Sequence, residues 1–101
     1  MADESFSKVD AKLAKALIKL AKKAHIPERE IFIRSLRDFS STYRNYDGLW
    51  LSLEDITWFE VFGVDNNSEL CEAIDDYLYR TTKIAVASEP YDYGTLLVYV
   101  Q

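Results

Sequence analysis

The segment SKVDAKLAKALIKLAKKAHIP, residues 7–27, constrains the fold most, because its apolar residues recur with a helical period. The apolar set falls within about 100° of a helical wheel, and it consists of Val9, Leu13, Ala16, Leu17, Leu20 and Ala24. Ser7 followed by Asp10 resembles a helix-capping pattern, and basic residues lie where the segment ends, where they suit the helix dipole. We therefore predict an amphipathic helix over about residues 7–25.

The segment after Pro27 carries a second helical pattern. Proline suits the first position of a helix, and Glu28 and Glu30 would lie in its first turn. Apolar side chains then recur at helical spacing, namely Phe32, Leu36, Phe39 and Tyr43. We predict a helix over about residues 28–40, although the residues EIFIRSL could also begin as a strand.

The remaining residues indicate strands and one further helix. Asp47-Gly48 is a typical two-residue hairpin turn and predicts a strand over about residues 49–53. Residues 55–62 are apolar on both faces, which fits a buried strand or a short helix, and we favour the strand. A capping Asn67 or Ser68 predicts a helix over about residues 68–80. The terminal segments KIAVAS and TLLVYVQ predict two strands joined by the loop SEPYDYGT, in which Gly94 permits a left-handed turn residue.

These elements predict the α+β class: two N-terminal helices, then an antiparallel sheet of roughly three to four strands with the 68–80 helix packed on it. Residues 1–101 would form one compact domain, with residues 1–6 as a frayed tail. The acidic start does not look like a signal peptide, and one cysteine excludes an internal disulfide. We therefore expect a cytoplasmic protein.

Residues that carry catalysis or bind metals do not form a recognisable pattern. His25, the only histidine, is expected to act as a cation at the end of its helix, and Cys71 is expected to lie in the core. Asp75 and Asp76 are adjacent on a helix, so their carboxylates point about 100° apart. Nucleotide-binding, zinc and calcium motifs are missing from the sequence. We expect a protein that is not an enzyme and needs neither cofactor nor metal.

Charge and aromatic residues are divided between the two parts of the chain. Residues 1–44 carry a net charge of +4, whereas residues 45–101 carry −9. Residues 45–101 also hold both tryptophans and six of the seven tyrosines, and the seventh is Tyr43. Tyrosines beside acids suit a basic protein surface, because tyrosine supplies large contact area at low entropic cost. The candidate partner-binding residues are Tyr46, Asp47, Glu72, Asp75, Asp76, Tyr79, Glu89, Tyr91, Asp92 and Tyr93. The alternative basic face consists of Lys8, Lys12, Lys15, Lys19, Lys22 and Lys23.

Our leading hypothesis is a small acidic protein that inhibits a larger basic partner by occluding its active or nucleic-acid-binding site. The partner would be a toxin, a nuclease or another nucleic-acid-binding effector, so the chain would be a toxin-immunity or phage counter-defence protein. One alternative is an adaptor that binds nucleic acid or anionic membrane through the lysine face. Another is a structural protein that assembles with itself in a salt-dependent way.

Three short blocks, IFIRSLRDF, GLWLSL and EAIDDY, loosely resemble in their order the blocks of ArdA-type antirestriction proteins. Those proteins are acidic mimics of DNA, so the resemblance implies the counter-defence form of the leading hypothesis. The blocks cover under half of the chain, and the lysine-rich helix has no counterpart in that pattern.

Overall fold

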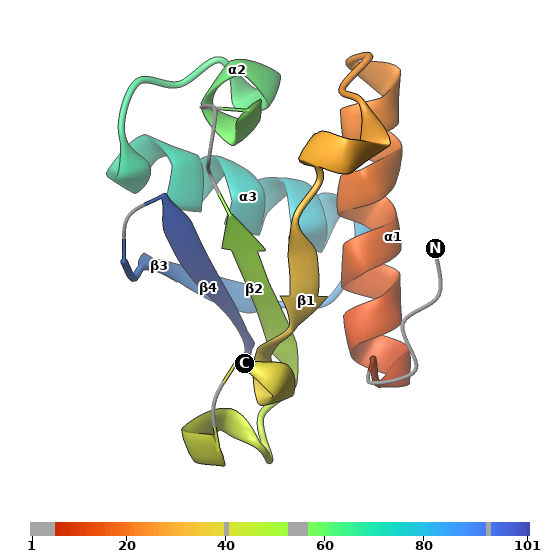
Figure 1. Ribbon diagram of the computed structural model, residues 1–101, viewed down its shortest axis with the longest axis vertical. Helices are drawn as coiled ribbons and strands as arrows, with labels where there is room; N and C mark the ends of the chain where they lie inside the picture. Colours follow the sequence, from red (N-terminus) through yellow and green to blue (C-terminus); the bar gives the residue numbers. More distant parts are fainter. Residues whose placement is uncertain (1–5, 40, 53–56, 93) are drawn as a thin grey trace.

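The computed structural model describes residues 6–39, 41–52, 57–92 and 94–101 (Figure 1). Its longer elements are α1 (Lys8–Lys23), β1 (Ile33–Ser35), β2 (Gly48–Ser52), α2 (Thr57–Phe62), α3 (Asn67–Thr82), β3 (Val86–Pro90) and β4 (Thr95–Val100). Three single 3-10 turns are η1 (Glu28–Glu30), η2 (Leu36–Asp38) and η3 (Ser41–Tyr43). The α+β class is therefore confirmed, as are the helices predicted over 7–25 and 68–80.

The four strands form one antiparallel sheet in the order β1-β2-β4-β3. The centre of the sheet is the pair β2–β4, in which Leu49 lies opposite Val98 and Leu51 opposite Leu96. Because side chains alternate across a strand, these leucines and Val98 share one side, while Trp50 and its partner Leu97 point to the other. The C-terminal strand β4 thus lies inside the sheet, between β2 and β3 (Figure 1).

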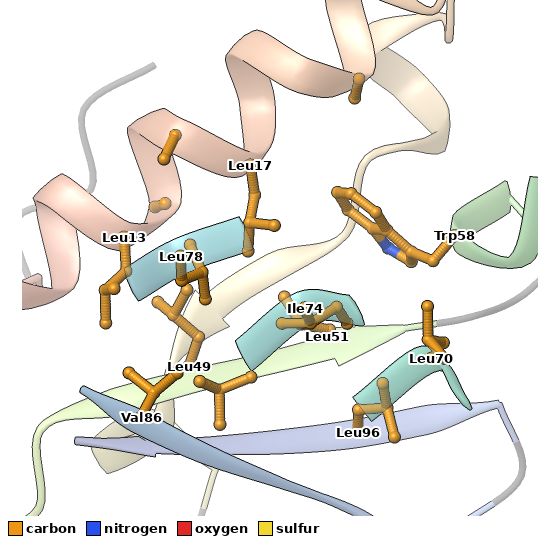
Figure 2. Packing of buried hydrophobic residues seen from close by; sticks show 14 of the residues in the cluster. Leu13, Leu17, Leu49, Leu51, Trp58, Leu70, Ile74, Leu78, Val86 and Leu96 are labelled. Atoms are coloured by element: carbon orange, nitrogen blue, oxygen red, sulfur yellow. The ribbon is translucent and has the colours of Figure 1, made fainter. Parts of the chain in front are cut away.

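Helices α1 and α3 pack on one side of this sheet and enclose the main core. Leu13 and Leu17 of α1 meet Ile74 and Leu78 of α3 above Leu49, all fully buried (Figure 2). A hydrogen bond joins the two helices, since the Tyr77 hydroxyl donates to the backbone oxygen of Ala16 at 2.8 Å. Phe6, which the sequence placed in the tail, packs partly buried against the same core.

Hydrogen bonds from local residues cap the N-termini of both long helices and close the C-terminus of α1. The Ser7 hydroxyl accepts from the backbone N–H of Asp10 at 3.0 Å, which confirms Ser7 as the N-cap of α1. The last turn of α1 closes when Ile26 N–H donates to Ala21 O at 3.0 Å, with His25 in the left-handed conformation at φ 63°. The N-cap predicted at Asn67 or Ser68 is wrong: the amide oxygen of Asn66 caps α3 by accepting from Glu69 N–H at 2.9 Å, and the helix begins at Asn67.

The helix predicted over residues 28–40 is wrong. In its place the chain forms η1, the short strand β1 and η2, and Ile33 and Ser35 of β1 lie opposite Leu51 and Leu49 of β2. Ile31 and Ser35 are buried while Phe32 and Arg34 are exposed, which is the alternation of a strand. Pairing with β2 therefore outweighed the helical spacing of the aromatic residues.

The hairpin turn predicted at Asp47-Gly48 is also wrong, although the strand that follows it is confirmed as β2. The connection between β1 and β2 spans residues 36–47, and Gly48 is the first residue of β2. Its φ of 156° is not that of a two-residue hairpin turn. A Cβ at Gly48 would lie 2.1 Å from the backbone oxygen of Val98, so the close approach of β4 requires glycine here.

The strand favoured for residues 55–62 is a helix, α2, over the part of that segment that the structure describes. Trp58 and Phe62, one turn apart, have ring centroids 6.4 Å apart, and the fully buried Trp58 points from α2 into the space between α1 and α3 (Figure 2). Gly63, at φ 64°, ends the helix while Val64 N–H donates to Phe59 O at 3.1 Å. Phe59, Val61 and Phe62 also pack partly buried against the core, which accounts for the apolar residues on both faces of this short helix.

The loop between β3 and β4 is confirmed as a hairpin connection. Tyr91 N–H donates to Thr95 O at 2.9 Å, and Gly94 takes the left-handed conformation at φ 63°. Pro90 ends β3, which is an edge strand, so it occupies a position where proline is tolerated. Tyr93 lies outside the described residues.

Candidate protein-binding surfaces

Five aromatic rings form a continuous cluster on the side of the sheet opposite α1 and α3, and we call this cluster the aromatic face. Its members are Phe39, Tyr43, Tyr46, Tyr91 and Tyr99. Ring centroids are 4.9 Å apart for Phe39 and Tyr91 and 6.0 Å apart for Tyr43 and Tyr99. Such tilted and edge-on contacts between rings are favourable beyond the area they bury.

The aromatic face arises from two parts of the chain. The connection between β1 and β2 supplies Phe39, Tyr43 and Tyr46, and the β3–β4 hairpin supplies Tyr91 and Tyr99. Tyr99 points to this side because Val98, its neighbour in β4, points into the main core. Leu97 also points to the aromatic side and is fully buried, so side chains cover the middle of this side of the sheet.

Two rings of the aromatic face remain open to solvent. Tyr46 is 52% exposed and Tyr91 is 56% exposed, although each contacts another ring of the cluster. Their neighbours hold them in place, so little side-chain freedom is left to lose on binding. Tyr46 and Tyr91 are the two rings of this cluster that expose the most surface.

Carboxylates lie at the rim of the aromatic face. Glu89 accepts a hydrogen bond from the Tyr99 hydroxyl at 2.6 Å, and Asp47 accepts one from Arg37 at 2.9 Å. Burial, followed by the bond to Glu89, raises the pKa of Tyr99 far above its usual value of 10.0. The exposed Asp92 lies in the hairpin. The structure thus brings together the candidates Tyr46, Asp47, Glu89, Tyr91 and Asp92.

Basic side chains accompany these acids on the same side of the sheet. Arg34 is exposed and lies opposite Trp50 in the β1–β2 pair, and Arg44 is exposed beside Tyr43. The charge of the aromatic face is therefore mixed, and its distinguishing property is its ring area.

The candidates on α3 lie on the helical side of the molecule, away from the aromatic face. Tyr79 is 53% exposed, with the Lys83 ammonium 6.0 Å from its ring centroid, and Glu72 is exposed. Asp76 is exposed and pairs with Arg80 at 2.9 Å. These residues form a second surface.

Asp75 has a role inside the molecule. Its carboxylate accepts hydrogen bonds from both the hydroxyl and the backbone N–H of Ser88 in β3. Burial raises the pKa of the Asp75 carboxyl, although both bonds from Ser88 act to lower it. Asp75 thus ties α3 to the edge strand and is only partly open to a partner.

The alternative basic face is fully formed. All its lysines are exposed on α1, and among the described residues none of them forms an ion pair: Lys8, Lys12, Lys15, Lys19, Lys22 and Lys23. The opposite face of α1 is buried in the core through Leu13, Leu17 and Ala21.

Cys71 and His25 are the side chains that the sequence offered for catalysis. Cys71 is buried as expected, and burial raises the pKa of its thiol. His25 is exposed in the last turn after α1. No cluster of histidine, cysteine, aspartate and glutamate suited to a metal ion occurs within the described ranges. None of the helices in that same part of the chain is long and apolar enough to cross a membrane.

Sequence reasoning missed the most connected polar residue, Asp10. Its carboxylate is fully buried and accepts from Gly48 N–H at 2.6 Å and from the Ser35 hydroxyl at 3.0 Å, with Arg37 at 3.9 Å. Burial raises the pKa of this carboxyl, against the lowering effect of those two bonds. The signal in the sequence was an aspartate at an otherwise apolar position of the predicted helix, because a buried carboxylate requires hydrogen-bond donors from elsewhere in the chain.

Comparisons of the chain with protein families, with curated proteins and with solved structures give no match. The resemblance to antirestriction proteins therefore gains no support from them.

Proposed function

We propose that this chain is a small binding protein, without catalytic activity of its own, that docks its aromatic face on a larger protein in the cytoplasm. The exposure of Tyr46 and Tyr91 on an ordered ring cluster carries the proposal. Tyrosines are common among the residues that dominate binding energy at protein interfaces. The helices cover the other side of the sheet, so a partner can approach the rings directly.

The partner that fits this face presents lysine and arginine side chains around an apolar centre. Glu89 and Asp92 lie at the rim of the rings, where carboxylates suit cations at the edge of a contact, whereas Asp47 already pairs with Arg37. The net charge of −5 also speeds the approach of a basic protein. Docking there would occlude the active or nucleic-acid-binding site of a toxin or nuclease, as an immunity or counter-defence protein does.

Site-specific photocrosslinking tests the proposal. A photoreactive residue is placed at position 46 or 91, and at position 79 as a matched control, because Tyr79 is equally exposed but lies on α3. In cell lysate we expect one protein to be crosslinked from positions 46 and 91 and not from position 79. Crosslinking from position 79 alone, or from none of the three, rejects the aromatic face as the binding surface.

Binding to the captured protein is then measured with purified variants. Tyr46→Ala and Tyr91→Ala should each weaken binding at least tenfold, about 1.4 kcal/mol, whereas Tyr79→Ala should leave it unchanged. Glu89→Gln keeps an acceptor for Tyr99 but loses the charge, so it should mainly slow association at low salt.

A further inference from the structure

The exposed acids of α3 form a row that matches the lysine face in spacing. Glu69, Glu72 and Asp76 are separated by three and four residues, and Lys12, Lys15 and Lys19 of α1 have the same separations. At 1.5 Å of rise per residue, each of these sets extends about 10 Å along its helix. We call Glu69, Glu72 and Asp76 the acidic row.

Among the described residues the acidic row forms no ion pair with the lysine face of the same molecule. Helix α3 runs across α1 (Figure 1), and the Tyr77 hydroxyl donates to the backbone oxygen of Ala16 where the two helices meet. Among the described residues the only ion pair of the acidic row is Asp76 with Arg80, one turn along α3. The two charged rows are therefore both exposed on the helical layer.

We propose that the lysine face of one copy of this chain docks on the acidic row of a second copy. Rows of opposite charge with equal spacing allow several pairs to form at once, whereas single exposed pairs contribute little. The contact leaves the aromatic face free, because α1 and α3 lie on the other side of the sheet. It therefore adds self-association to the proposed function and does not depend on it.

Two other occupants of the lysine face fit less well. A membrane-surface helix inserts its apolar face among lipids, but the apolar face of α1 is buried in the core of the protein. A nucleic acid would meet a chain with a net charge of −5, and that charge repels phosphates. A second copy can place its acidic row against the lysine face, and its lysine face against the acidic row, so each row meets the opposite charge.

Sedimentation velocity of the full chain at low and high salt tests the contact. At about 10 mM salt, where the screening length is about 30 Å, we expect a species of at least twice the monomer mass. At about 1 M salt, where that length is about 3 Å, we expect the monomer alone. A monomer under both conditions, or an assembly that salt does not change, overturns the proposal.

Charge reversal identifies the surfaces. The variants Lys12→Glu/Lys15→Glu/Lys19→Glu and Glu69→Lys/Glu72→Lys/Asp76→Lys should each be monomeric at low salt, because like charges then face each other. A mixture of the two should assemble again, since the first variant offers two acidic rows and the second offers two basic ones. Failure of the mixture to assemble, while circular dichroism shows both variants folded, overturns the proposal.

A matched control and two probes complete the experiment. Glu28→Lys/Asp38→Lys changes exposed acids outside both rows and should assemble like the unchanged chain. Fluorescence anisotropy with a labelled DNA duplex, and flotation with anionic vesicles, then test the other occupants. Binding of either probe that the lysine variant loses, by a chain that stays monomeric, overturns the proposal in favour of that occupant.

Discussion

The carboxylate of Asp10 in α1 accepts a hydrogen bond of 2.6 Å from the backbone N–H of Gly48, the first residue of β2. The same carboxylate accepts from Ser35 of β1, so one buried side chain joins the first helix to two strands. Replacement by alanine leaves both donors buried without an acceptor, and each bond to a charged group contributes about 1.5–3 kcal/mol. We expect Asp10→Ala to lower the free energy of unfolding by about 3 kcal/mol or more, measured by urea denaturation. The exposed Asp38→Ala is the control and should change it by less than about 0.5 kcal/mol.

Gly48 and Gly63 offer a matched pair of glycine substitutions. A side chain at Gly48 meets the Val98 backbone at 2.1 Å, whereas a Cβ at Gly63 has nothing within 4 Å. Gly63→Ala should therefore lose only about 1–2 kcal/mol, the cost of a left-handed alanine. Gly48→Ala should lose more than about 4 kcal/mol, because β2 and β4 must separate. Thermal unfolding distinguishes the two, and equal melting temperatures would contradict the register of β2 with β4.

Asp75 predicts a stability change with pH. The pKa of Asp75 is raised above its ordinary value of 3.8 in the folded protein. At a pH between 3.8 and this folded-state pKa, the folded state therefore binds more protons than the unfolded state. Asp75 therefore contributes more stability as the pH falls through its folded pKa towards 3.8, and less as the pH rises. Asp75→Asn does not titrate, so it should destabilise the protein more near the lower limit of this window than at neutral pH. Chemical denaturation at both pH values measures this, with the neighbouring Asp76→Asn as control; the opposite trend means that the Ser88 bonds lower the pKa.

Tyr99 predicts sensitivity to alkali. Its pKa lies above the usual value of 10.0 in the folded protein, so the unfolded chain loses this proton first as the pH rises. Stability should fall as the pH rises above 10.0, and Tyr99→Phe should fall less steeply than the unchanged chain. Tyr46→Phe is the control and should keep the steep fall. Absorbance of phenolate during alkaline titration should show that Tyr99→Phe loses an ionisation above pH 10.0.

The sequence predicted those elements whose signals are local. Ser7 and the apolar stripe of α1 act within a few residues, as do the polar residues before α3, although the cap there is Asn66 and not Asn67 or Ser68. The short strand β1 could not be predicted in the same way, because its conformation depends on β2, which lies beyond a long connection. The same is true of Asp47-Gly48, where the approach of β4 decides the geometry.

The sequence predicted which types of residue form the candidate surface, but not which of these residues lie together in space. Tyrosines beside acids indicated an interface, and the structure joins Tyr46 to the distant Tyr91 through Tyr43 and Phe39. It also assigns Asp75 to an internal contact with Ser88. Grouping of this kind follows from the order of the strands in the sheet, which no local pattern contains.

The interior position of β4 has a consequence for synthesis of the protein. Ribosomes make chains from the N-terminus, and β4 is the last strand to emerge, yet it forms both the β2–β4 and the β3–β4 ladders. Until residues 95–100 leave the ribosome, β2 can pair only with the three-residue β1, and a two-stranded pair is marginal in water. The complete sheet therefore forms only after translation of β4, which must insert between β2 and β3.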